Sequence, residues 1–229
     1  MTLPLLALGV VMGIVVSWLY SQTIGTRPWL QPRQLAGAGE SRLVFPVKKV
    51  GLAVFLAVVA SLFSLFISAF LMRMQEADWK NLALPDSLWV NTLILVAASV
   101  SFEVVRVAAR NGREALMKVA LLGAGAFTGS FLAGQLMVWQ GLNAAGNFPA
   151  ANPANAFFFM LTAVHGLHLV GGLWVWFRAT VKAWRGAGSA NVAQSVDLCA
   201  MYWHFLLLVW LVLFALLWAS SQGRLLYCN

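Results

Sequence analysis

Long apolar runs, separated by short segments that carry most of the charge, dominate the pattern of this 229-residue chain. Each run is continuous over about 20 residues, the length that an α-helix needs to cross the hydrocarbon core of a bilayer. Strands of a membrane barrel would instead show ~10-residue segments of alternating polarity. The pattern therefore predicts an all-α protein with six membrane-spanning helices: Leu3–Tyr20, Val50–Met72, Leu88–Ala108, Val119–Leu142, Ala154–Phe177 and Cys199–Ala219.

The composition supports a polytopic membrane protein and argues against a nucleic-acid partner. Hydrophobic residues make up 61% of the chain and charged residues only 10%, whereas soluble domains carry about 25% charged residues. The net charge of +8 could indicate a nucleic-acid binder. The basic residues, however, lie in short patches beside apolar spans, which is typical of residues that orient helices in a membrane.

The positions of the basic residues predict the orientation of the helices. Most of the 15 Lys and Arg residues lie in alternate loops, at 21–49, 106–118 and 178–198. Basic loops stay in the cytoplasm, so both termini are expected on the outer, periplasmic side. No Lys or Arg precedes the first span, which favours an uncleaved helix over a cleaved signal peptide.

These features divide the chain into four parts, with two further loops inside the third part. We expect an N-terminal transmembrane helix, a Pro- and Gly-containing cytoplasmic linker, a five-helix bundle and an outer C-terminal tail, at 1–20, 21–49, 50–219 and 220–229. Segment 141–153 is expected to be an outer turn region. Segment 185–198, rich in small residues, is expected to be a cytoplasmic loop.

Few polar side chains fall inside the predicted spans, and those with the strongest functional potential are Asn91, Glu103, Gln135, His165, His168 and His204. Buried polar groups in lipid are costly unless they are paired, so these residues are the functional candidates. Histidines on facing helices could ligate haem. Alternatively, each could bond a carbonyl or hydroxyl group of a neighbouring helix and fix the packing. We favour packing, because the histidines form one close pair and one residue at a different depth.

Glu103 lies three residues before Arg106, which predicts an i,i+3 ion pair near the end of the third span. A proton-relay acid is the alternative. A relay needs several titratable groups in sequence, and no second acid lies in any predicted span. The sequence therefore gives no support for proton pumping by this chain alone.

Four motifs resemble those of subunit III of the haem–copper cytochrome oxidases, in the family's order and spacing over residues 50–219. One is Asn-Pro-x-Asn-x-Phe-Phe-Phe-Met-Leu-Thr followed by His165-Gly-Leu-His168. Another is Tyr202-Trp203-His204-Phe205 followed by Val209-Trp210. The remaining two are Val90-Asn91-Thr92 and Gln135 with Trp139 four residues later.

The resemblance implies an accessory subunit in the bacterial inner membrane that does no catalysis alone and carries no redox centre or metal. Haem and copper would lie in partner subunits I and II, with cytochrome c as donor to the complex and phospholipid held in a cleft. A subunit of a related quinol oxidase or nitric oxide reductase is one alternative. A haem-binding electron-transfer protein is an alternative from another class.

The resemblance and the polar inventory together define the candidate site residues. A role in lipid contact or helix packing is expected for Asn91, Gln135, Trp139, His165, His168, Trp203, His204 and Trp210. Contacts with phospholipid head groups are expected for Arg106, Arg178 and Lys182.

Three positions depart from the family pattern. Val59, Val138 and Leu207 stand where the family usually has acidic residues. Any role that depends on those carboxylates is in doubt for this chain, which favours a scaffold and lipid role over a proton role.

Overall fold

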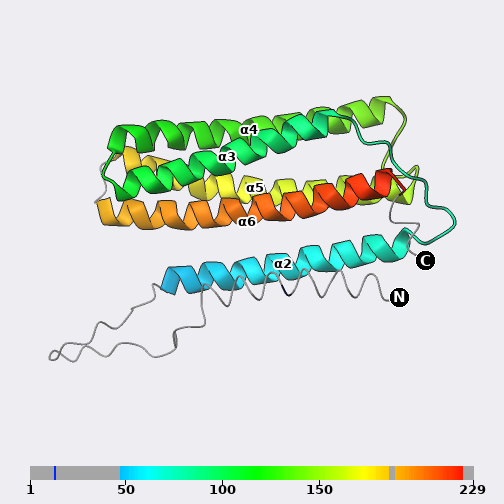
Figure 1. Ribbon diagram of the computed structural model, residues 1–229, viewed down its shortest axis with the longest axis horizontal. Helices are drawn as coiled ribbons and strands as arrows, with labels where there is room; N and C mark the ends of the chain where they lie inside the picture. Colours follow the sequence, from blue (N-terminus) through cyan, green and yellow to red (C-terminus); the bar gives the residue numbers. More distant parts are fainter. Residues whose placement is uncertain (1–12, 14–46, 186–188, 224–229) are drawn as a thin grey trace. The chain divides into compact units, whose positions relative to one another are not determined.

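The computed structural model describes residue 13, residues 47–185 and residues 189–223 of the chain. Within these ranges it contains helices and no strand, so the all-α prediction is confirmed. Five long helices follow one another, labelled as in Figure 1: α2 (Val47–Arg73), α3 (Ser87–Arg110), α4 (Glu114–Ala144), α5 (Pro153–Trp184) and α6 (Ser189–Ser221). The predicted first span, Leu3–Tyr20, lies outside the described residues except for Gly13.

All five helices are long and apolar enough to cross a membrane. The shortest, α3, has 24 residues, which corresponds to about 36 Å at 1.5 Å per residue. Five of the six predicted spans therefore coincide with helices of membrane-spanning length. The first predicted span, Leu3–Tyr20, and the orientation of the termini remain predictions.

The predicted loop at 185–198 is wrong for most of its length, because α6 begins at Ser189. The prediction ended the helix where the apolar run ends. Polar residues can continue a helix beyond the hydrocarbon, and here Asp197 accepts a hydrogen bond from Arg110 of α3 at 3.1 Å. The loop is therefore much shorter than the sequence indicated.

Only residues 111–113 join α3 to α4, and a glycine makes this tight connection practicable. Gly112 adopts a positive φ of 67°, a conformation with little steric cost for glycine alone. Its N–H bonds the carbonyl of Ala109, and the N–H of Arg113 bonds the carbonyl of Ala108. This is the Schellman arrangement, which satisfies the last carbonyls of a helix.

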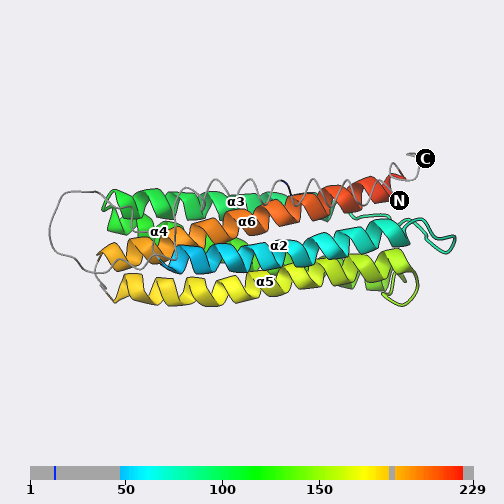
Figure 2. The same ribbon diagram turned by 90° about the horizontal axis from the view of Figure 1, so that it is seen from below.

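Helices α3 to α6 form a four-helix bundle, in which α3 packs against α4 and α6, and α5 packs against the same two helices (Figure 1 and Figure 2). The core consists of large side chains such as Phe102, Phe131, Phe158, Trp203 and Trp210. The outward surface is also apolar, as expected for helices that face lipid. Residues 47–69 of α2 belong to a separate compact unit.

Candidate functional site

Three buried or half-buried tryptophans connect the helices of the bundle through threonine hydroxyls. Each indole N–H donates to a threonine on a different helix, and each threonine donates its own proton to the carbonyl four residues earlier. The threonine oxygen is thereby left with a lone pair for the indole. The pairs are Trp139–Thr162 at 3.1 Å, Trp203–Thr128 at 3.0 Å and Trp210–Thr92 at 3.0 Å.

The sequence predicted the three tryptophans as site residues but not their threonine partners. A threonine in an apolar helix can satisfy its hydroxyl on its own backbone, so its position alone gives no signal. Thr92 and Thr162 lie in the motifs that resemble subunit III, yet nothing in those motifs indicates which tryptophan each one meets. That information depends on the arrangement of the helices.

His165 lies fully buried at the centre of the bundle. Its Nε2 lies 3.1 Å from the carbonyl oxygen of Leu206 on α6, and its ring packs on the indole of Trp210 with centroids 5.0 Å apart. The edge of Phe131 covers another side. The ring is therefore enclosed by protein, between side chains and backbone of α4 and α6.

His168 is placed differently from its neighbour His165. Its Nδ1 lies 2.8 Å from the carbonyl of Val164, one turn earlier in the same helix. The backbone of His168, on the other hand, takes part in a bond between helices: its carbonyl accepts a hydrogen bond from the Tyr202 hydroxyl of α6 at 2.8 Å. Tyr202 is thus a contact residue that the site prediction omitted, although it lies in a quoted motif.

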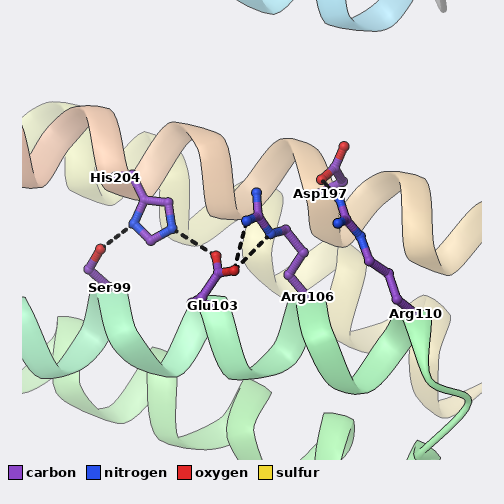
Figure 3. Close-up of polar contacts among 6 residues, drawn as sticks. All are labelled: Ser99, Glu103, Arg106, Arg110, Asp197 and His204. Carbon is purple, nitrogen blue, oxygen red and sulfur yellow. Dashed lines mark hydrogen bonds and ion pairs between the residues drawn. The ribbon is translucent and has the colours of Figure 1, made fainter.

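A cluster of polar side chains joins α3 to α6 near one end of the bundle (Figure 3). The guanidinium of Arg106 donates from Nη2 to Glu103 Oε1 at 2.7 Å and from Nε at 3.2 Å, which confirms the predicted ion pair. His204 lies between the two helices, with Nε2 3.2 Å from Glu103 Oε2 and Nδ1 2.5 Å from Ser99 Oγ. The bond between Glu103 and His204 could not be predicted from the spacing of residues in either helix.

Asn91 and Gln135 meet between α3 and α4. The Asn91 amide donates to the side-chain oxygen of Gln135 and to the carbonyl of Phe131, both at 3.4 Å. Gly134 allows this approach, because a Cβ at this position would collide with the Asn91 side chain. Asn91 and Val138 also border a groove of about 960 Å³ along α3 and α4.

The remaining basic candidates, Arg178 and Lys182, lie exposed on the last two turns of α5. They share this part of the helix with exposed Trp174 and Phe177, whose rings stack with centroids 6.4 Å apart. Arg106 differs from them because it is engaged by Glu103. The three basic candidates therefore do not form one site.

No group of three or more His, Cys, Asp or Glu side chains that could hold a metal ion occurs in the described part of the chain. The polar side chains of the bundle instead bond one another or backbone carbonyls, mostly between helices. The fold and these contacts define a polytopic α-helical membrane protein whose intramembrane polar groups join its own helices.

The sequence comparisons identify the family. The family model described as Cytochrome c oxidase subunit III matches residues 49–221, and the chain belongs to this family. The predicted resemblance is thereby confirmed.

Several curated relatives carry corresponding names. Cytochrome c oxidase subunit 3 of Thermostichus vulcanus is 30% identical over 178 residues, which cover 76% of this chain and 87% of the relative. The same subunit of Corynebacterium diphtheriae is 26% identical over 207 residues, covering 85% and 96%. Cytochrome bo(3) ubiquinol oxidase subunit 3 of Pseudomonas putida is 29% identical over 139 residues, covering 58% and 64%. The match thus spans less than two thirds of the P. putida relative.

Proposed function

We propose that this chain is an accessory, non-catalytic subunit of a terminal haem–copper oxidase in a bacterial inner membrane. Partner subunits I and II hold the haem and copper and pass electrons from cytochrome c to oxygen. The observation that carries the proposal is the family match over residues 49–221. The engagement of Trp203, Trp210 and His165 in cross-helix packing supports a scaffold role.

The first test is purification in mild detergent with a tag after Asn229, followed by mass spectrometry of the co-purifying chains. A haem–copper catalytic subunit and its visible spectrum are expected in the same fraction. A colourless chain that purifies alone, or with unrelated proteins, would contradict the proposal.

A quinol oxidase is the second candidate, because relatives in P. putida and P. aeruginosa are named subunit 3 of a ubiquinol oxidase. The two candidates differ in the electron donor. Oxygen consumption by the purified complex with reduced cytochrome c, but not with ubiquinol, is the outcome expected for the first candidate. The opposite preference would favour the second.

Phospholipid binding is proposed at the exposed basic end of α5. Arg178 and Lys182 are spaced four residues apart, on the same side of the helix. Each basic side chain near a membrane surface contributes about 1 kcal/mol to the attraction of anionic lipid head groups. The double change to alanine should lower the phospholipid retained per complex. Lys118→Ala is the matched control, because its ammonium lies 3.8 Å from Glu114 in an ion pair.

A further inference from the structure

Three side chains of the polar cluster in Figure 3 are partly exposed. We call it the α3–α6 seam: Ser99, Glu103, Arg106 and Arg110 of α3 with Asp197 and His204 of α6. The side chains of Glu103, Arg106 and His204 are 37%, 31% and 40% exposed. By contrast, Trp203, Trp210 and His165 are at most 1% exposed.

The seam reaches into the membrane-spanning part of α3. Since a helix rises 1.5 Å per residue, Glu103 lies about 10 Å inside the end of the span at Arg110. Ionisable side chains within spans almost always face a bundle interior or a water-filled cavity rather than lipid. Partial exposure of three of them on one face therefore indicates that this face is covered.

The hydrogen bonds within the seam use both carboxylate oxygens of Glu103 but only some of the N–H donors of Arg106. Both carboxylate oxygens of Glu103 are engaged, Oε1 by Arg106 and Oε2 by His204. The bonds that Arg106 makes to described residues go to Glu103 alone, and they use two of the five guanidinium N–H donors. Arginine side chains carry a positive charge in proteins and have no hydrogen-bond acceptor. The outward side of the guanidinium consequently calls for a hydrogen-bond acceptor.

The surface around these groups is apolar. Val100, Val104 and Val107 lie exposed on α3, and Leu208 and Leu211 lie exposed on α6. A polar centre with apolar flanks is the pattern of helix pairs in membranes, where van der Waals packing is combined with a few interhelical hydrogen bonds. A lipid phosphate suits this place less well, because the Glu103 carboxylate lies 2.7 Å from the guanidinium and repels an anion.

From these observations we infer that the α3–α6 seam is the docking surface for a membrane helix of a partner chain. That helix offers a hydrogen-bond acceptor, such as a side-chain amide or hydroxyl oxygen, at the depth of Arg106. The inference rests on the proposed function, since it requires that the chain is a subunit of a complex. Beyond the proposed function, the inference states which face of the chain contacts the partner and which chemical group of the partner meets Arg106.

Photo-cross-linking in the purified complex tests the surface directly. Benzoylphenylalanine is placed at Val104 or Leu208, which lie beside the seam. The same residue placed at Leu167, which is 69% exposed on α5, serves as the control. The probes at Val104 and Leu208 should form adducts with one membrane helix of a partner chain, identified by peptide mass spectrometry. The probe at Leu167 should form no such adduct. Adducts only with phospholipid, or only with α2 of the same chain, would overturn the inference while the oxidase chains still co-purify.

Substitutions test the chemistry. Arg106→Leu removes the donors but leaves Glu103 charged, so the double variant Glu103→Gln/Arg106→Leu is needed to separate docking from folding. We expect both variants to dissociate from the complex about tenfold faster in detergent, as for loss of one charge-assisted hydrogen bond. Lys118→Leu, outside the seam, should dissociate like wild type. A double variant that unfolds like wild type and is retained like wild type would refute the inference.

If no oxidase chain co-purifies with the wild-type protein, the proposed function and this inference both fail. If the oxidase chains co-purify and the seam variants are retained, only this inference fails. The two proposals can therefore be told apart in the same preparation.

Discussion

Two adjacent glycines of α5 offer a sharp test of how closely α5 packs on α6. A Cβ added at Gly172 would lie 2.6 Å from a ring carbon of Tyr202 and 2.9 Å from one of Trp203. A Cβ added at Gly171 would meet nothing within 4 Å. The variants Gly171→Ala and Gly172→Ala therefore differ mainly in the contacts that the added methyl group makes.

Neither obstructing ring can move aside without losing a contact. Tyr202 is held by its hydroxyl on the carbonyl of His168 at 2.8 Å. Trp203 is held by Thr128 at 3.0 Å and by the ring of Phe102, with centroids 4.2 Å apart. Overpacking of this kind costs about 1–3 kcal/mol.

The gain in helix propensity from glycine to alanine, up to about 1 kcal/mol, is common to both variants and cancels in their difference. Gly172→Ala should accordingly be about 1–3 kcal/mol less stable than Gly171→Ala. Titration of the purified chain in mixed micelles with SDS, followed by tryptophan fluorescence and circular dichroism, measures this difference. Equal stability of the two variants would show that α5 and α6 are not in contact at Gly172.

Three further predictions follow from single contacts. Thr92→Val removes the acceptor of the Trp210 indole and should cost about 0.6–1.5 kcal/mol in the same titration; an unchanged midpoint would contradict this. His168→Ala should weaken retention of the chain in the complex, and retention like wild type after detergent washing would contradict this. Hydrogen bonding to Arg73 lowers the pKa of Asp78, so their ion pair persists above the ordinary carboxyl pKa and is lost as pH falls through the lowered value. A ¹³C titration of Asp78 should therefore show a lower midpoint in wild type than in Arg73→Gln.

The sequence predicted well those features that depend on neighbouring residues of one helix. Apolar runs predicted the five described helices, and the three-residue spacing predicted the Glu103–Arg106 ion pair. The start of α6 at Ser189, rather than Cys199, was missed because hydropathy marks the hydrocarbon layer and not the end of hydrogen bonding in the helix.

Contacts between helices could be predicted only as residue types. His165 was expected to bond a neighbouring carbonyl, but not that of Leu206 in particular. The approach of His204 to Glu103 joins residues 101 positions apart in the sequence, and nothing in either helix alone specifies it. Such pairs depend on the rotation and register of α3 and α6, which apolar surfaces on all sides leave undetermined in the sequence.

The tryptophan–threonine pairs have a consequence for a protein placed across a proton gradient. Neither an indole nor a threonine hydroxyl gains or loses a proton at physiological pH, and the three pairs connect α3 to α6, α4 to α6 and α4 to α5. These bonds are therefore indifferent to the acidity on either side of the membrane. These three connections between helices can persist while proton concentrations around the protein rise and fall with respiration.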